Sequence, residues 1–510
     1  MDAAPRPVDG LGFTARPPST STDEGLTSKL RRCSRDLIRF CTPSLVDGPG
    51  LDPWSVDLSI SYAPAGSMLE HSHWFADAEA VVVDAQGCDR AFLVPAGSTT
   101  ANLAVVRALA RLGRPGTVLV DRQAHHSVIR GLAMCGVSWR PIDADRWDDA
   151  FECPRPVHPS DVARAIRATE ADDPDGVAAV ILVSPTYGGE VADLGAIRSI
   201  IDRWAPGAVF HVDEAWGSHL AFHPDLRPHR AARFAHVVSQ STHKAGGALQ
   251  PGAVLLWNDG PLPHDVLDAA YLDVMSTGAS FLITASIDHA YRRLVADGAA
   301  LLGRSIDLTA RLTVGLRAAV PGGRLLADEH PAGADGVVFQ DPTKVTLALP
   351  PGPVTGYAVR DALFDREIVV EKATPATVTF LTTFGIDHAA VDTTVAAVAE
   401  IVAAIEGDGG PDRLAVPNPF AGAAAVPAVA PWVAQRAAQH AAVEVALDDA
   451  IGRIAVEQVE AYPPGVAVIS EGFVVTAGAV ENLRAIRAAG GSIVARRPDL
   501  TGLRVLATAD

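Results

Sequence analysis

Short apolar runs alternate with amphipathic stretches between about residues 75 and 305. The apolar runs suit strands that are buried on both faces, and they are Gly116–Asp121, Val177–Ser184, Val209–Asp213 and Val237–Gln240. The stretches with helical periodicity are Thr100–Leu112, Pro159–Thr169 and Leu194–Trp204. Strand and helix in alternation predict an α/β fold with a mostly parallel, doubly wound sheet.

The pattern changes after about residue 305. Helices are expected at Ile306–Val320, Thr355–Leu363 and His388–Ile405, and strands at Val337–Gln340, Val345–Leu349, Ile368–Glu371 and Thr377–Thr383. This order is typical of a smaller α+β domain. Residues 406–435 are rich in Gly, Ala and Pro and are interpreted as a linker.

The remaining segments complete a five-part division of the chain. Residues 1–60 are interpreted as an N-terminal arm with a short helix around Ser28–Phe40, and residues 436–510 as a C-terminal α/β unit. The expected boundaries are therefore 1–60 for the arm, 61–305 for the large domain, 306–405 for the small domain, 406–435 for the linker and 436–510 for the C-terminal domain.

The composition limits which binding partners and which cell compartment suit this protein. The 510 residues carry a net charge of −18, which disfavours nucleic acid and anionic membranes as partners. The five cysteines form no CxxC pair, and residues 1–25 contain no apolar signal-peptide core. The apolar run Ala421–Ala434 is short and contains Pro427 and Pro431. We therefore expect a cytoplasmic protein that acts on a small molecule.

A turn rich in glycine and hydroxyl groups leads from a strand into a helix at Ala96–Asn102. Free amides at a helix N-terminus favour an anion, and hydroxyl groups add donors. Ser98, Thr99 and Thr100, with Ser241 from a later segment, are the candidate phosphate ligands. The alternative is an ordinary capped helix.

Two further strand ends carry polar side chains. His125 follows the strand Gly116–Asp121 and is placed to stack on an aromatic cofactor, although an exposed loop histidine is the alternative. Asp213 ends an apolar strand, where a buried carboxylate needs a partner such as a protonated ring nitrogen. An N-cap or a buried ion pair is the other interpretation of Asp213. Trp216 is either packing or a pocket wall.

Lys244 stands at the end of another predicted strand and is the only lysine between positions 30 and 343. Burial disfavours the charged form of an amine, and a neutral amine forms imines with aldehydes. A phosphate turn, a stacking histidine, a strand-end aspartate and a strand-end lysine, in this order, are typical of enzymes that hold pyridoxal 5'-phosphate (PLP) as a Schiff base. In such a site Asp213 keeps the pyridine nitrogen protonated, so that the ring can accept an electron pair.

Several segments resemble the bacterial ornithine/lysine/arginine decarboxylases, over roughly residues 60–510. The similar segments are Gly97–Asn102, Asp121–His125, Pro185–Gly189, Asp213–Trp216, Ser241–Lys244, Asp341–Thr346, Val369–Lys372, Gly385–Asp387 and Tyr462–Gly465. The resemblance implies the PLP-dependent aspartate-aminotransferase-like fold (fold type I) and decarboxylation of arginine, lysine or ornithine. A receiver-like N-terminal wing is not recognised, so we expect a short form of the family.

The resemblance also implies roles for individual residues. Lys244, His243, Asp213 and His125 are the expected catalytic residues, and Ala215 and Trp216 join the expected cofactor-binding set. Ser276 and Thr277 are expected to reach the cofactor of a second copy in a homodimer or larger homo-oligomer with shared active sites. The product amine would enter polyamine biosynthesis.

Two segments depart from the family pattern. Residues 278–281 read Gly-Ala-Ser-Phe, where the family tends to place a tyrosine, and residues 470–472 read Ser-Glu-Gly, which displaces an expected acid. Another PLP reaction, by an aminotransferase or an oxygen-using amino-acid oxidase, is therefore the alternative. A non-catalytic protein is disfavoured by the presence of both Lys244 and Asp213.

A metal site is not expected. Glu70–His73 contains a His-x-His pair, but no third ligand is evident in the sequence. His211, His219 and His223, and likewise Lys344 and the neighbours Glu371 and Lys372, are interpreted as structural.

Overall fold

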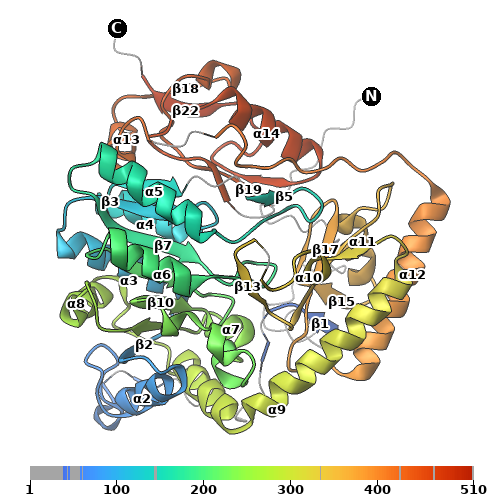
Figure 1. The fold of residues 1–510 in the computed structure, drawn as a ribbon, viewed down its shortest axis with the longest axis horizontal. Helices are drawn as coiled ribbons and strands as arrows, with labels where there is room; N and C mark the ends of the chain where they lie inside the picture. The colour runs from blue at the N-terminus through green and yellow to red at the C-terminus, as the bar shows by residue number, and fades with distance from the viewer. Residues whose placement is uncertain are drawn as a thin grey trace.

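The computed structural model describes residues 38–42, 44–45, 58–59, 61–142, 146–333, 335–423, 427–462 and 466–507. Three bodies of secondary structure lie around a common centre (Figure 1). One is built on a seven-stranded sheet, the second on a four-stranded sheet, and the third is the C-terminal part, drawn in red. Each body has a hydrophobic cluster of its own.

The large sheet has the strand order β2-β11-β10-β9-β7-β3-β4. Its strands are β2 (Arg90–Val94), β3 (Thr117–Asp121), β4 (Trp139–Ile142), β7 (Val177–Val183), β9 (Val209–Asp213), β10 (Val237–Gln240) and β11 (Ala253–Trp257). Only β11 runs antiparallel to its two neighbours. The four strands expected from apolar runs are confirmed, as is the α/β class with a mostly parallel sheet.

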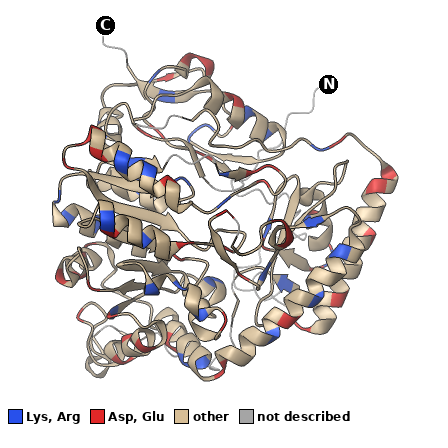
Figure 2. Cartoon of the chain, in the orientation of Figure 1, with Lys and Arg blue, Asp and Glu red and all other residues tan. Residues whose placement is uncertain are grey.

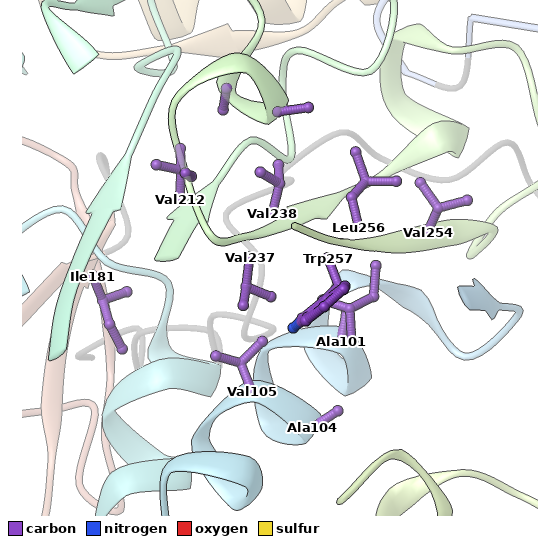
Figure 3. Close-up of a cluster of buried hydrophobic side chains, with 14 of the residues drawn as sticks. Ala101, Ala104, Val105, Ile181, Val212, Val237, Val238, Val254, Leu256 and Trp257 are labelled. Atoms are coloured by element: carbon purple, nitrogen blue, oxygen red, sulfur yellow. The ribbon is translucent and has the colours of Figure 1, made fainter. Parts of the chain in front are cut away.

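Both faces of this sheet are buried. In the close-up of the core, Val237 and Trp257 point toward α3 (Gly97–Leu112), whereas Val238 and Leu256 point to the opposite face (Figure 3). Successive side chains of a strand alternate between faces, so a strand covered on both sides is apolar throughout. This explains why continuous apolar runs, and not alternating patterns, marked these strands in the sequence.

Helices cover the large sheet as the periodicity predicted. They are α2 (Trp74–Gln86), α3, α4 (His126–Cys135), α5 (Pro159–Asp172), α6 (Leu194–Trp204), α7 (Thr242–Ala245) and α8 (His264–Val274). The expected helices Thr100–Leu112, Pro159–Thr169 and Leu194–Trp204 are confirmed within α3, α5 and α6. Short 3-10 turns lie at Ala63–Ala65, Leu220–Phe222, Arg227–His229 and Ala231–Arg233.

The small sheet has the order β12-β14-β17-β16. Its strands are β12 (Arg324–Leu325), β14 (Lys344–Ala348), β17 (Thr377–Leu381) and β16 (Lys372–Ala373). Around it pack α9 (Phe281–Ala319), α10 (Leu326–Glu329), α11 (Gly356–Phe364) and α12 (His388–Asp408). The expected helix at Ile306–Val320 is the second half of α9, which is 39 residues long and runs without a break from the large sheet to the small one.

Strand β13 (Val337–Gln340) was expected as part of the small domain. It pairs instead with β8 (Glu190–Ala192) of the large body, in an antiparallel two-stranded sheet. This pairing ties the two bodies together by backbone hydrogen bonds. A further short antiparallel pair joins β5 (Trp147–Asp148) and β6 (Cys153–Pro154).

The N-terminal arm differs from the expected helix in its described part. Residues Ile38–Phe40 form strand β1, which pairs in parallel with β15 (Ile368–Val370). Phe40 is fully buried and contacts Phe380 edge-on, with ring centroids 5.6 Å apart. Strand pairing and burial of an aromatic ring outweigh local helix propensity here. Residues 28–37 of the expected helix lie outside the described residues.

The C-terminal part contains two small antiparallel sheets and two helices. The elements are α13 (Pro431–Ala437), β18 (Ala442–Val445), a 3-10 turn at Asp448–Ala450, β19 (Val459–Tyr462), β20 (Val466–Ile469), α14 (Ala477–Ala488), β21 (Ser492–Val494) and β22 (Leu503–Leu506). β18 pairs with β22, and β19 lies between β20 and β21. Helix α13 packs against α4, so this part is anchored on the large body.

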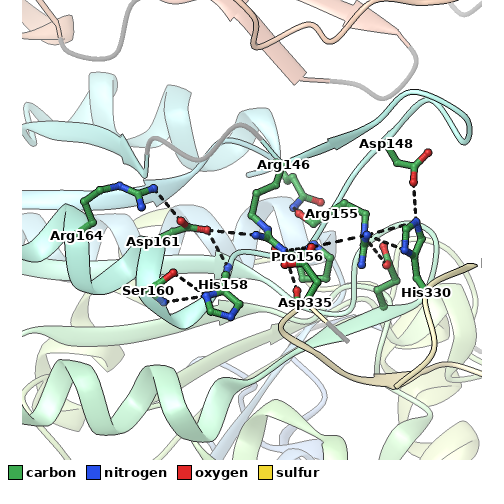
Figure 4. Close-up of polar contacts among 12 residues, drawn as sticks. Arg146, Asp148, Arg155, Pro156, His158, Ser160, Asp161, Arg164, His330 and Asp335 are labelled. Carbon is green, nitrogen blue, oxygen red and sulfur yellow. Dashed lines mark hydrogen bonds and ion pairs between the residues drawn. The ribbon is translucent and has the colours of Figure 1, made fainter. Parts of the chain in front are cut away.

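A polar network fixes the boundary between the large and small bodies (Figure 4). Arg155 donates to Glu190 at 2.8 Å and contacts the ring of His330, which in turn lies 2.6 Å from Asp148. Arg155 and Glu190 are both buried. Burial raises the pKa of Glu190 to about 7, against the lowering effect of Arg155. A buried pair of this kind is costly to break, because the remaining charge has no partner.

Charged residues gather on the outer helices, while the strands of the large sheet carry few (Figure 2). Among the described residues, α12 is the one helix whose length and hydropathy would allow it to cross a membrane. Its buried residues, including Val391, Val398 and Ile401, belong to the hydrophobic cluster of the small body. In this fold α12 therefore buries one face in the small body and packs along α9.

Phe40 provides a test of the arm. We expect Phe40→Ala to destabilise the small body by about 3–5 kcal/mol, because it leaves a cavity against Phe380. The measurement is the melting temperature of the purified protein. Phe364→Ala is the matched control, since Phe364 is 38% exposed. Equal melting temperatures for the two variants would show that the arm does not contribute to this core.

Candidate active site

The candidate residues converge because the parallel strands end at the same edge of the sheet. Asp213 is the last residue of β9, His125 follows β3, and Ser241 and Lys244 follow β10. Gly97, after β2, begins α3 at the same edge. The carboxyl ends of parallel strands form the usual binding crevice of α/β sheets. Residues separated by more than one hundred positions in sequence therefore share one site.

Lys244 lies in the short helix α7 with its ammonium 4.2 Å from the centroid of the Trp216 ring. Burial and the charge of Lys344 lower the pKa of Lys244 to about 8, against the opposing effects of Asp213 and Glu371. The neutral amine is therefore far more accessible near neutral pH than that of an ordinary lysine. A neutral buried amine is a competent nucleophile toward an aldehyde.

A second buried lysine shares the Trp216 ring. Lys344 of β14 places its Nζ 4.8 Å from the ring centroid and 3.6 Å from Asp341 Oδ2. The same carboxylate oxygen lies 3.2 Å from Nε2 of His219. Lys344 therefore lies against the same ring as Lys244, and its ion pair with Asp341 agrees with the structural role that the sequence suggested.

Glu371 adds a carboxylate to the same neighbourhood. Its Oε1 accepts a hydrogen bond from the Tyr187 hydroxyl at 2.7 Å, and its Oε2 accepts one from the Thr42 backbone amide at 2.7 Å. The Tyr187 ring lies 4.6 Å from Trp216, and the Nζ of Lys372 lies 4.8 Å from the Tyr187 ring. Burial raises the pKa of Glu371, and its two hydrogen bonds oppose this. Tyr187 and Trp216 thus form an aromatic wall surrounded by three lysines.

Asp213 is held by two donors on the opposite side of the site. Its Oδ2 accepts from Asn102 Nδ2 at 2.8 Å, and its Oδ1 accepts from the Ala215 backbone amide at 3.1 Å. The carboxylate is buried, and these bonds compensate part of its lost hydration. The bond from the Ala215 amide, two residues on, is of the local capping kind, whereas the bond from Asn102 comes from a distant helix.

His125 caps the N-terminus of α4 and stands at the mouth of the site. Its Nδ1 lies 2.8 Å from Ser127 Oγ and accepts from the Ser127 backbone amide at 3.3 Å. Partial desolvation lowers the pKa of the His125 imidazole, and so do the nearby charges of His126, Lys244 and Arg130, although the residue is exposed on one side. The imidazole is therefore neutral across the physiological pH range.

The expected turn from strand into helix is present at Gly97, in the first turn of α3. Gly97 has φ +88°, and a Cβ there would meet Pro251 at 3.4 Å. Ala96, the N-cap residue, makes no side-chain capping bond, so the amides of the first turn are left for another acceptor. Ser98 Oγ lies 2.6 Å from Ser241 Oγ, which brings two of the predicted hydroxyls together.

The other predicted residues lie in α3, in α7 and on the loop between α8 and α9. Thr99 is exposed in the first turn of α3, and Thr100 Oγ1 donates back to the Ala96 carbonyl at 3.1 Å. His243 Nδ1 donates to the Gly252 carbonyl at 2.9 Å, and burial lowers its pKa. Ser276 and Thr277 are exposed on the loop between α8 and α9, where Ser276 Oγ contacts Gly278.

The C-terminal part reaches the mouth of the site through β19. Arg130 donates to Glu460 Oε1 at 2.6 Å, and His126 Nδ1 lies 3.7 Å from Glu460 Oε2. The His125 and His126 rings are 4.0 Å apart. Phe473 packs on Trp139 with ring centroids 5.2 Å apart. Pro463–Gly465, part of the family-like segment Tyr462–Gly465, lies outside the described residues.

Comparison with known proteins identifies the family of this chain. The sequence model described as "Orn/Lys/Arg decarboxylase, major domain" matches residues 47–318, more than half of the 510 residues. The chain belongs to the Orn/Lys/Arg decarboxylase family. This confirms the resemblance found in the sequence, and it makes the protein a lyase that decarboxylates a basic amino acid.

Two curated relatives of this decarboxylase illustrate the range of similarity. An arginine decarboxylase of Bacillus anthracis is 26% identical over 475 residues, which cover 90% of this chain and 92% of that protein. The constitutive lysine decarboxylase of Escherichia coli is 27% identical over 407 residues, which cover 68% of this chain and 56% of that protein.

Solved structures confirm the fold of the decarboxylase. The lysine decarboxylase LdcF of Francisella novicida superposes with a TM-score of 0.76 at 20% identity, over 89% of this chain and 75% of that one. A serine palmitoyltransferase from S. paucimobilis, solved with a bound PLP adduct, superposes with a TM-score of 0.54 at 17% identity, over 73% of this chain and 88% of that one. The PLP fold-type I architecture expected from the sequence is therefore confirmed.

Sequence reasoning missed several residues that the fold brings to the site. Asn102 and Ser127 lie inside segments that the motifs had already marked, but their side chains were given no role. Tyr187 lies in the family-like segment Pro185–Gly189 and was equally unassigned. Lys344 and Glu371 come from the small body, and no pattern in the sequence places them against Trp216.

The acidity of Lys244 gives a test of this arrangement. In cofactor-free protein, the rate of condensation with PLP should rise with pH with a midpoint near 8, since only the neutral amine reacts. Lys344→Met removes a like charge and should move the midpoint up, whereas Glu371→Gln removes an opposite charge and should move it down. Rapid mixing with visible absorbance measures the rate.

Lys372→Met is the matched control, since Lys372 is a half-buried lysine that lies against Tyr187. It should leave the midpoint near that of the unmodified protein. If Lys344→Met and Lys372→Met gave the same midpoint, Lys344 would not act on Lys244 by charge.

Proposed function

We propose that this decarboxylase binds PLP covalently through Lys244 and that arginine is its substrate. The observation that carries the proposal is the convergence of a buried lysine of lowered pKa, a doubly hydrogen-bonded aspartate and an uncapped helix N-terminus at one sheet edge. This set matches the three functional parts of PLP, which are an aldehyde, a pyridine nitrogen and a phosphate.

The residues fit the cofactor in chemistry as well as in number. The first-turn amides of α3, with Ser98, Thr99, Thr100 and Ser241, would hold the phosphate. Asp213 would accept a hydrogen bond from the protonated pyridine nitrogen, since the carboxylate keeps lone pairs beyond those used by Asn102 and Ala215. Trp216 would bound the pocket beside Lys244, and His125 would lie against the ring.

PLP supplies an electron sink for the pair released when a bond at the substrate α-carbon breaks. The residues of this chain prepare and direct that chemistry. Lys244 would offer a neutral amine at the start of each turnover. The same amine would be free again, as a proton acceptor, when the turnover ends. Asp213 would keep a proton on the ring nitrogen. The neutral His125 would contact the cofactor ring or an oxygen atom beside it without adding a charge to the site. His243, with Nδ1 committed to Gly252, presents Nε2 as a proton acceptor.

Arginine is favoured over lysine and ornithine by the extent of the match. The Bacillus anthracis arginine decarboxylase aligns along 90% of this chain, whereas the Escherichia coli lysine decarboxylase aligns along 68%. The net charge of −18 attracts a cationic substrate over long range. The product amine would supply polyamine synthesis.

We further propose a cytoplasmic homodimer with the five-part division given above. The exposed pair Ser276 and Thr277 would then reach the site of the partner chain, as the family resemblance implies. Cys41, Cys88, Cys135 and Cys153 are free thiols, which suits a reducing compartment. The separate hydrophobic clusters of the large, small and C-terminal bodies support the division.

The decisive experiment measures carbon dioxide release and product mass from PLP-loaded protein offered arginine, lysine and ornithine in turn. Release with arginine and formation of its decarboxylated amine are expected. Release with lysine or ornithine only would overturn the substrate. Pyridoxamine phosphate with an oxo acid would indicate transamination, and oxygen consumption would indicate oxidation; either without carbon dioxide would overturn the reaction.

Variants of Lys244 and Asp213 test the cofactor site. Lys244→Ala should abolish the visible absorbance of covalently bound PLP. Asp213→Ala should retain part of the cofactor but lose turnover by roughly 10²-fold or more, because the ring nitrogen loses its charge partner. Asp225→Ala, at an exposed aspartate, is the control. Near-normal turnover of Asp213→Ala would show that Asp213 does not hold the ring.

A further inference from the structure

One side-chain amide connects the two polar residues that flank the proposed ring site. Asn102 of α3 donates from Nδ2 to Asp213 Oδ2 at 2.8 Å and to Ser127 Oγ at 3.1 Å. Ser127 Oγ lies 2.8 Å from His125 Nδ1. The three side chains Asn102, Ser127 and Asp213 are each at most 3% exposed. A continuous chain of hydrogen bonds therefore runs from the buried Asp213, through Asn102 and Ser127, to the exposed His125.

The proton positions along this chain are fixed by elementary rules. An ionised carboxylate only accepts, so the group that Asn102 presents to Asp213 is its NH₂ and not its carbonyl oxygen. The same NH₂ reaches Ser127 Oγ, which accepts there. His125 Nδ1 already accepts from the Ser127 backbone amide at 3.3 Å. The Ser127 hydroxyl proton therefore points to His125 Nδ1, and the imidazole carries its own proton on Nε2.

The electrostatic setting agrees with this tautomer. Desolvation and the neighbouring charges of His126, Lys244 and Arg130 lower the pKa of His125, which favours the neutral ring, and Nδ1 accepts from the Ser127 amide. A second proton on Nδ1 would oppose the Ser127 hydroxyl and backbone amide, both of which donate. Nε2–H is then the only donor that the ring offers to a carboxylate or phenolate oxygen in the site.

We propose that Asn102 and Ser127 are positioning residues that connect Asp213 to His125. Asn102 directs the Asp213 carboxylate, and Ser127 fixes the His125 proton on Nε2. This rests on the proposed function only where it concerns PLP, because the histidine tautomer is a property of the cofactor-free chain. Asn102 and Ser127 touch neither reacting atom nor cofactor in this assignment. They act through the two residues that they hold.

The inference predicts distinct effects for the two residues. Asn102→Leu keeps the side-chain size but removes the donor to Asp213, so the carboxylate is held by the Ala215 amide alone. Ser127→Ala leaves the bond from Asn102 to Asp213 intact and removes only the hydroxyl donor to His125. Ser127→Thr restores a hydroxyl and should restore the native tautomer.

The first measurement uses cofactor-free protein. Nitrogen-15 NMR of the imidazole, with His125 assigned by comparison with His125→Gln, should show a proton on Nε2 in the unmodified chain and in Ser127→Thr. Ser127→Ala should show a mixture of tautomers. A native tautomer in Ser127→Ala would overturn the inference, whether or not the protein decarboxylates any amino acid.

The second measurement uses PLP-loaded protein and follows its visible absorbance as a function of pH. Asn102→Leu should shift the titration midpoint by about one pH unit and lower kcat about tenfold, with KM little changed, because the ring nitrogen is held less firmly. Ser127→Ala should shift the midpoint less. Asn258→Leu is the matched control: Asn258 bonds the Ala232 and Ala235 carbonyls, and its loss should move stability but not the midpoint.

An unchanged midpoint in Asn102→Leu would remove Asn102 from this role. If Asn102→Leu does not fold, the inference is tested by the His125 tautomer alone, in the comparison of Ser127→Ala with Ser127→Thr. Absence of carbon dioxide release, with the tautomer still dependent on Ser127, would count against the proposed function while leaving the hydrogen-bond chain in place.

Discussion

The common direction of β3, β7, β9 and β10 is the constraint on which this site depends. Parallel strands connected through helices deliver their carboxyl ends to one edge, whatever the lengths of the connections. His125, Asp213 and Lys244 each follow a different strand of this set. The chain therefore assembles three chemically different groups within one crevice, and the strands behind them are rigid because both faces of the sheet are buried (Figure 3).

Charge in the crevice is balanced between the two bodies. The large body contributes Asp213, Lys244 and Trp216, and the small body contributes Lys344, Glu371 and Asp341. Lys344 and Lys244 approach the same tryptophan ring, at 4.8 and 4.2 Å from its centroid. Burying three lysines near one another is unfavourable, so it depends on Glu371, Asp341 and the aromatic faces for compensation. The pairing of β8 with β13 and the Arg155 network hold the two bodies at the separation that this balance needs.

The polar residues on the other side of the site interact through hydrogen bonds more than through charge pairs. There a single asparagine bridges a carboxylate and a hydroxyl, and directional hydrogen bonds replace charge pairing. Such bonds hold a geometry more narrowly than a pair of charges does, because the donor directions are fixed by the amide plane. The site thus combines a side that sets the amine of Lys244 by electrostatics with a side that orients Asp213 and His125 by hydrogen bonds.

The sequence by itself determined the fold class and the family, and it marked Lys244, Asp213 and His125 as polar residues at the ends of neighbouring strands. Buried parallel strands are continuous apolar runs, and polar residues at their ends stand out against them. Only the tertiary structure decided that Ile38–Phe40 is a strand, because its partner β15 lies more than 300 residues away in sequence. The same holds for Asn102, Ser127, Tyr187, Lys344 and Glu371. Their roles come from contacts between elements, and a contact between distant segments leaves no periodic or local signal in the chain.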